Sequence, residues 1–162
     1  MIRILSIGLP LISLVALAAT PVEAEQGGKW RGRAVLVVTS EKGVEVADKP
    51  DHKVWITEYD GVVFTEVGGE FLNNARYQVV DMTDAGGDMV NGGYKTFTMP
   101  DDSKITASYT LREGNPPVFK GEWKFLSGTG RYQGISGTGT YEVHQVGPTA
   151  LWDILEGEYK LP

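Results

Sequence analysis

The stretch GTGRYQGISGTG, residues 128–139, places five glycines in twelve positions and decides between two very different folds. A dinucleotide-binding loop needs the pattern Gly-x-Gly-x-x-Gly between a strand and a helix, so that the phosphate meets the helix N-terminus. Here Gly128, Gly130 and Gly134 have a different spacing, and the residues that follow have the pattern of a strand. The stretch therefore predicts a tight connection between two strands, where glycine supplies the positive φ angles of a turn.

Short segments typical of β-strands occupy the chain after residue 30. They are rich in β-branched and aromatic residues and are separated by Gly, Pro, Asn and Asp. The Asp60-Gly61 pair between the second and third segments predicts a two-residue hairpin turn. The predicted strands span residues 33–40, 53–59, 62–67, 75–82, 93–99, 103–112, 118–126, 137–146 and 154–161.

The clearest two-residue alternation lies in residues 105–111, where Ile105, Ala107, Tyr109 and Leu111 share one face. No segment after residue 30 sustains a helical period. Eight or nine short strands without interleaved helices predict an all-β antiparallel sandwich or barrel. We favour a single eight-stranded barrel, because closure removes the exposed edges that invite aggregation.

The first residues have the features of a secretory signal peptide. One cation precedes an apolar run from Ile4 to Ala19, and Val22 and Ala24 supply the small-residue pattern that signal peptidase accepts. A proline interrupts this run, which is shorter than the ~20 residues of a spanning helix. The sequence therefore predicts a signal peptide over residues 1–24, one barrel domain over residues 25–162, and a secreted or periplasmic protein without a membrane span.

Composition excludes several classes of function. The absence of cysteine excludes disulfides, thiolate metal sites, covalent haem attachment and cysteine nucleophiles. The net charge is −6, and no cluster of Lys and Arg is present, so nucleic acid and anionic membrane surfaces are poor partners.

The segment GEWKFLSGTGRYQGISGTGTYEV, residues 121–143, resembles the late hairpin of the allene oxide cyclase-like barrels, a group that includes the dirigent proteins. The shared features are the Gly-Thr-Gly at 128–130, an aromatic residue at Tyr132 and a glycine at Gly134. A later Gly-Glu-Tyr, residues 157–159, is similar to a segment of many small exported bacterial proteins of unassigned function.

This resemblance covers residues 88–161 and implies an eight-stranded, calycin-like antiparallel barrel with an apolar interior. Plant members of the group cyclise an unsaturated epoxide or steer radical coupling without a cofactor. Their catalytic carboxylate and asparagine cannot be matched to residues of this sequence, so the resemblance carries no activity over and implies no cofactor.

Candidate metal ligands are few. Glu142 and His144 lie two apart on a predicted strand and share a face, but the sequence shows no third ligand beside them. Asp81, Asp84 and Asp88 do not have the spacing of an EF-hand loop and are better explained as part of a turn. We predict no metal site.

A functional acid or base would have to lie inside the barrel, where burial raises the pKa of a carboxyl group. Glu58, Glu66 and Glu142 are the candidates, because they lie within apolar strands. No serine pairs recognisably with a histidine, so a hydrolytic triad is not supported.

Aromatic side chains are the candidate ligand-binding groups, because Tyr and Trp combine apolar area with a hydrogen-bond donor. We predict ligand contacts for Trp55, Tyr94, Tyr109 and Trp123. The alternative is that these rings simply pack the core.

The leading hypothesis for function is a non-enzymatic exported barrel that binds a small, largely apolar molecule. A second hypothesis is a cofactor-independent isomerase or cyclase, which an interior carboxylate beside a cavity would favour. A third is a structural or partner-binding protein, such as a homo-oligomer formed through an exposed strand face. A fully packed interior would exclude the first hypothesis.

Overall fold

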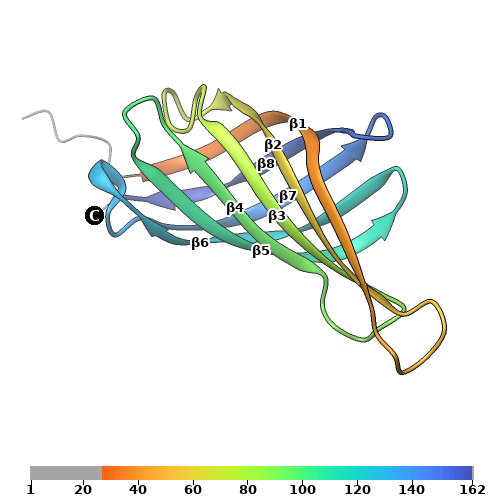
Figure 1. Ribbon diagram of the computed structural model, residues 1–162. Helices are drawn as coiled ribbons and strands as arrows, with labels where there is room; N and C mark the ends of the chain where they lie inside the picture. The colour runs from red at the N-terminus through yellow and green to blue at the C-terminus, as the bar shows by residue number, and fades with distance from the viewer. Residues whose placement is uncertain (1–26, 162) are drawn as a thin grey trace, which may run out of the picture.

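Eight antiparallel strands pair in the order of the sequence, and the last strand pairs with the first to close a barrel (Figure 1). The computed structural model describes residues 27–161, so the predicted signal peptide over residues 1–24 lies outside the described residues. The predicted all-β, eight-stranded barrel is confirmed. The strands are β1 (Gly27–Glu45), β2 (Lys53–Val67), β3 (Arg76–Ala85), β4 (Gly92–Thr98), β5 (Lys104–Asn115), β6 (Val118–Gly128), β7 (Ser136–Gln145) and β8 (Ala150–Lys160).

The alternation of side chains places every second residue inside the barrel. In β5, Ile105, Ala107 and Tyr109 are buried, whereas the residues between them are partly exposed. In β8, Leu155 and Tyr159 are buried in the same way. The barrel interior is thus lined by one face of each strand, as the two-residue period requires.

The glycine-rich stretch is a connection between two strands, as predicted. β6 ends at Gly128, a single 3-10 turn η1 (Gly130–Tyr132) follows, and β7 begins at Ser136. Gly130 and Gly134 have φ angles of 58° and 85°, which side chains other than glycine rarely adopt. Between residues 27 and 161 no helix is long and apolar enough to cross a membrane.

The predicted hairpin at Asp60-Gly61 is wrong, because β2 runs without a break from residue 53 to residue 67. Gly61 faces Leu36 of β1, and a Cβ at Gly61 would lie 1.9 Å from the carbonyl oxygen of Val35. The glycine therefore permits two strands to approach closely inside the sheet. Asp60 is held at the barrel surface by an ion pair of 2.6 Å with Arg76 of β3.

One end of the barrel is filled by aromatic rings. The segment 68–75 between β2 and β3 carries Phe71 and Leu72 into the interior, where both are buried. Phe71 stacks on Tyr159 with ring centroids 3.6 Å apart, and Trp30 meets Phe71 edge-on at 5.8 Å. This packing closes that end of the barrel to solvent.

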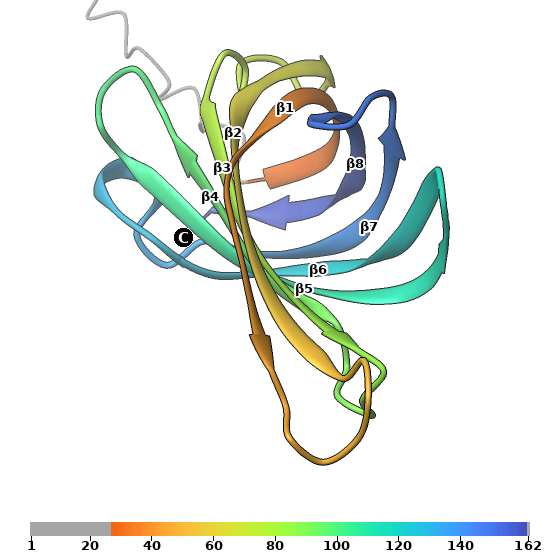
Figure 2. The same ribbon diagram turned by 45° about the vertical axis from the view of Figure 1, so that its right-hand side comes forward.

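The strands β1 and β2 extend beyond the barrel wall as an arm, and the end of β3 pairs with β2 along it as far as Lys53 (Figure 2). The pairing continues to Glu45 and Lys53 at the tip. Trp55 lies on this arm, where its indole packs against Gly43 of the opposite strand.

We predict that Gly139→Ala destabilises the protein while Gly28→Ala does not. A Cβ at Gly139 would lie 1.9 Å from the carbonyl oxygen of Glu156 and 2.5 Å from the Trp123 indole, whereas Gly28 has no atom within 4 Å. Overpacking of this kind costs roughly 1–3 kcal/mol. Thermal unfolding of the two variants measures the difference, and equal melting temperatures would contradict it.

Candidate functional site

The end of the barrel opposite the aromatic packing contains a cavity of about 430 Å³. Its wall is mostly apolar, with a smaller set of polar side chains that converge from several strands. The apolar lining includes Leu36, Val79, Leu111, Phe119, Val143 and Leu151. The polar lining includes Tyr59, Asp81, Lys95, Tyr109, Tyr141 and Asp153.

A buried ion pair lies where the cavity meets the packed core. The Lys95 ammonium donates to Asp153 Oδ2 at 2.7 Å and to the Tyr77 hydroxyl at 2.6 Å. The Tyr77 hydroxyl in turn donates to Asp153 Oδ2 at 2.8 Å. The side chains of Lys95 and Asp153 are only 2% and 1% exposed, so the two charges are compensated by one another and not by water.

The two oxygens of the Asp153 carboxylate are not equally satisfied. Its Oδ2 accepts both of the hydrogen bonds above, whereas its Oδ1 is buried and has no hydrogen-bond partner. Buried polar atoms nearly always have a partner, so this oxygen is one of few exceptions among the described residues.

Asp81 of β3 is a second inward carboxylate on the cavity wall. It accepts the Tyr109 hydroxyl at 2.5 Å and the Thr83 hydroxyl at 2.8 Å. Burial and then the charge of Asp81 raise the pKa of Tyr59 to about 12. Burial likewise raises the pKa of Tyr109 and of Tyr141, so the hydroxyls of these tyrosines stay protonated at neutral pH.

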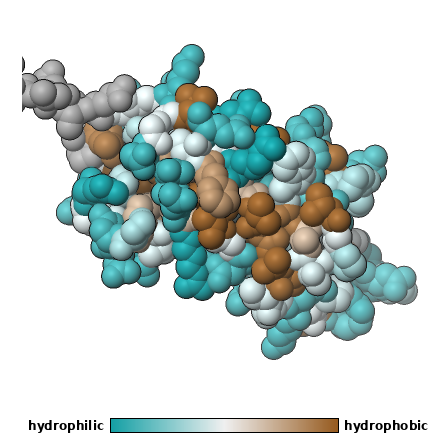
Figure 3. Space-filling view, turned by 90° about the horizontal axis from the view of Figure 1, so that it is seen from above, coloured by the Kyte–Doolittle hydropathy of each residue, from teal (hydrophilic) through white to brown (hydrophobic). Residues whose placement is uncertain are grey.

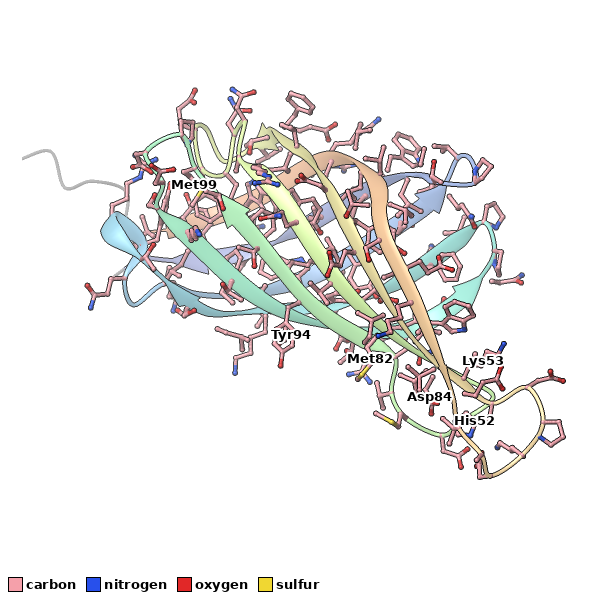
Figure 4. The ribbon with its side chains drawn as sticks, in the orientation of Figure 1. His52, Lys53, Met82, Asp84, Tyr94 and Met99 are labelled. Atoms are coloured by element: carbon pink, nitrogen blue, oxygen red, sulfur yellow. The ribbon has the colours of Figure 1, made fainter. Side chains whose placement is uncertain are left out.

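The four predicted ligand-binding residues do not meet at one place. Tyr109 lines the cavity. Trp123 lies among the packed aromatic rings, where its indole N–H donates to the Thr140 carbonyl at 3.0 Å. Tyr94 points away from the barrel and is 56% exposed (Figure 4), and Trp55 lies on the β1–β2 arm outside the cavity lining.

The three predicted glutamates do not lie inside the barrel, and that expectation was wrong. Glu58 is exposed, and Glu66 forms ion pairs with Arg31 at 2.9 Å and Arg33 at 3.2 Å on the barrel surface. Asp81, which lies in β3 and not in the turn that the sequence analysis predicted, and Asp153, which that analysis missed, are carboxylates of the cavity lining. Their positions in the alternation were a usable signal, because they share the parity of buried neighbours on their strands.

Glu142 pairs with two basic groups on the outer side of β7. Its oxygens lie 2.6 Å from His144 Nε2 and 3.0 Å from the Lys120 ammonium. The two hydrogen bonds lower the pKa of Glu142. Among residues 27–161 no group of three His, Cys, Asp or Glu side chains is arranged to hold a metal ion.

A histidine clasp, formed by His52 with Asp48 and Asp84, holds the connection between β1 and β2 against the end of β3 (Figure 4). His52 lies 2.6 Å from Asp48 and 2.7 Å from the buried Asp84. The backbone N–H of Asp84 donates to the side-chain oxygen of Asn91, which lines the cavity. The clasp therefore connects the β1–β2 arm to one edge of the cavity.

The outer face of the barrel carries exposed apolar side chains on β1 and β2, among them Val35, Val37, Val62 and Phe64. Figure 3 shows apolar surface gathered on the face seen from above. A face of this kind is what the hypothesis of a partner-binding protein requires.

The sequence and the fold of the barrel can be compared with those of known proteins. No protein-family model matches the sequence, and no curated protein matches it either. Among solved structures, the pterocarpan synthase dirigent protein PsPTS1 is similar, with a TM-score of 0.55 and 12% identity over 85% of this chain and 96% of that chain. The chain has a dirigent-like barrel fold.

A second dirigent-like barrel, the pterocarpan synthase dirigent protein GePTS1, is similar with a TM-score of 0.52 and 13% identity. The match covers 92% of this chain and 98% of that chain. At this identity the likeness concerns the fold alone. It confirms the fold that the glycine-rich hairpin implied, whereas the roles of individual residues have to be argued from the cavity.

We predict that Lys95→Met destabilises the barrel by about 3–5 kcal/mol, because it leaves the Asp153 carboxylate buried without its cation. The double variant Lys95→Met/Asp153→Asn removes both charges and is expected to recover at least half of that loss. Urea unfolding measures all three proteins. A single variant as stable as the wild type would show that the ion pair is not needed.

We predict that the histidine clasp stabilises the protein more in mildly acidic than in alkaline solution. Hydrogen bonds to Asp84 and then to Asp48 raise the pKa of His52 above its usual 6.5. The stabilisation is therefore complete below pH 6.5 and is lost as the pH rises through the folded-state pKa. The pKa of Asp84 is lowered, first by the Met89 N–H and then by His52, so its contribution is lost only in stronger acid, below its usual 3.8.

The measurement is the difference in melting temperature between the wild type and His52→Gln. We expect a larger difference at about pH 5.5 than at about pH 9. A difference that is independent of pH, or that grows in alkali, would contradict the role of the clasp.

Proposed function

We propose that this chain is an exported barrel that binds a small, largely apolar molecule in its interior cavity. The observation that carries the proposal is the cavity itself, about 430 Å³ in volume and lined mainly by apolar side chains. This volume is within the range of roughly 300–1,000 Å³ that small-molecule sites occupy. A few convergent polar groups on a mostly apolar wall are the usual means of orienting such a ligand.

The uneven filling of the barrel supports this proposal. An eight-stranded barrel has an interior that side chains can fill completely or that holds one small ligand. Here large aromatic rings fill one end, with Phe71 and Trp30 at its centre, while the wall around Leu151 and Val143 leaves space. The empty part is not required by the fold, so its retention is best explained by an occupant.

The second candidate function is a cofactor-independent isomerase or cyclase in the same cavity. The specific observation that favours it is the presence of Asp81 and Asp153 on the cavity wall, each hydrogen-bonded to a tyrosine hydroxyl. A carboxylate in such a place can act as a general acid or base. The binding proposal ranks first, because it needs only the cavity and no assigned chemistry.

The test is the binding of N-phenyl-1-naphthylamine, an uncharged apolar fluorophore, to wild-type protein and to two tryptophan variants. Val38 lines the cavity, so Val38→Trp fills part of it and is expected to weaken binding at least ~10-fold, a loss of about 1.4 kcal/mol. Val35→Trp is the control, because Val35 is 55% exposed on the same strand and its replacement leaves the cavity unchanged.

Fluorescence titration measures the affinities, and circular dichroism confirms that both variants fold. The proposal would be wrong if the wild type showed no saturable binding, or if Val38→Trp bound the fluorophore as tightly as Val35→Trp does.

A further inference from the structure

We propose that the ligand of this cavity is an organic cation, with an apolar body and an ammonium group that Asp81 holds among tyrosine rings. The inference rests on the proposed binding function and names its ligand class. It comes from the charges and hydrogen-bonding capacity of the cavity wall.

The charged side chains that line the cavity do not balance. Three are carboxylates, Glu41, Asp81 and Asp153, and one is a cation, Lys95. The Lys95 ammonium is already paired with Asp153 at 2.7 Å. Two carboxylates of the lining, Asp81 and Glu41, therefore have no cation within the cavity, so its electrostatic potential favours a positively charged occupant.

Asp81 is the better placed of the two to contact a ligand. It lies on the wall and is only partly buried, whereas Glu41 is exposed on β1. The oxygens of Asp81 accept one hydroxyl each, from Tyr109 and from Thr83, and carboxylate oxygens have capacity for more. A carboxylate on an apolar wall is costly to desolvate, and an ammonium group that enters with the ligand offsets that cost.

Three tyrosines share the cavity wall with Asp81. Tyr59, Tyr109 and Tyr141 all line the cavity, and the charge of Asp81 contributes to the raised pKa of each of them. Aromatic faces attract organic cations, by up to about 2 kcal/mol when water is excluded.

The same wall already holds one ammonium group in this way. The Lys95 ammonium lies 4.9 Å from the ring centroid of Tyr109 and 4.4 Å from that of Tyr141. Two rings of this cavity thus already attract a cation, and Tyr59 adds a third ring to the lining.

The other inward carboxylate, Asp153, is not open to a ligand. Asp153 lines the cavity with a side chain that is 1% exposed, and its Oδ1 has no hydrogen-bond partner. This oxygen can accept an N–H or O–H but cannot donate. It has almost no accessible surface, so a ligand in the cavity does not reach it. Asp81 is therefore the inward carboxylate left to receive a donor, which an ammonium or a hydroxyl can supply and a carboxylate ligand cannot.

The experiment compares three probes with the same 4-phenylbutyl body and different charge: 4-phenylbutylammonium, 4-phenylbutan-1-ol and 5-phenylpentanoate. Isothermal titration calorimetry of the wild type near neutral pH measures their affinities. We expect the ammonium to bind at least ~10-fold more tightly than the alcohol, and the carboxylate to bind most weakly, because only the ammonium both neutralises Asp81 and donates to it.

The variant Asp81→Asn removes the charge and keeps an oxygen that can accept the Tyr109 hydroxyl. It is expected to reduce the preference for the ammonium over the alcohol to less than ~3-fold. Asp102→Asn is the matched control, because it removes one charge from an exposed residue in the connection between β4 and β5, at a φ of 62° that asparagine tolerates. It is expected to leave the preference unchanged.

The outcomes separate the inference from the function on which it rests. An ammonium preference that Asp81→Asn abolishes and Asp102→Asn retains supports the inference. If the alcohol or the carboxylate binds the wild type as tightly as the ammonium does, or if Asp81→Asn keeps the preference, the ligand is not a cation held by Asp81 and the binding function still stands. If neither the three probes nor N-phenyl-1-naphthylamine binds the wild type, both proposals are wrong. The wild-type comparison remains decisive even if Asp81→Asn fails to fold.

Discussion

The ion pair between Lys95 and Asp153 divides the interior of this barrel into two parts. On one side Tyr77, which bonds to both charges, stacks on Phe97 with ring centroids 4.8 Å apart, and Phe97 continues into the packed aromatic rings. On the other side the same two charges face the cavity. A buried pair of this kind is held only while both partners and their hydrogen bonds are in place, so the packed end and the hollow end depend on one another.

The packed end depends on the match between large and small residues across neighbouring strands. The Trp123 indole lies against Gly139 and Gly157, at positions where a Cβ would come within 2.5 Å of the ring. Glycine at these positions gives space to one large side chain, and that side chain fills the barrel where eight strands would otherwise enclose a void. At the hollow end Gly121 likewise gives space to Tyr141, but the rings there line the cavity and do not fill it.

The alternation of residues along the strands could be predicted well, and with it the class of fold. Ile105, Ala107 and Tyr109 face inward as expected, because a buried face and a wet face leave a two-residue period in the sequence. The prediction of a hairpin turn from the Asp-Gly pair failed at Asp60-Gly61. A glycine needed for close approach of two strands has the same local signature as a glycine needed for a turn, and only the pairing with β1 distinguishes them.

The candidate site was harder to predict, because sequence reasoning assigned glutamates within apolar segments to the interior. The inward carboxylates are Asp81 and Asp153, whose charges are tolerated because Tyr109 and Lys95 come from other strands to meet them. Those strands are far away in the sequence. For the same reason Tyr109 lies at the cavity while Tyr94, an equally plausible ring, faces outward.

The amino-acid sequence by itself therefore determined that the chain forms an antiparallel barrel and that residues 128–139 connect two of its strands. These features follow from the two-residue alternation and from the φ angles open to glycine. Both depend only on residues that are close together in the sequence. Only the tertiary structure decided which end of the barrel is filled and which charges line the other end, because both depend on the register between strands that closure of the barrel imposes.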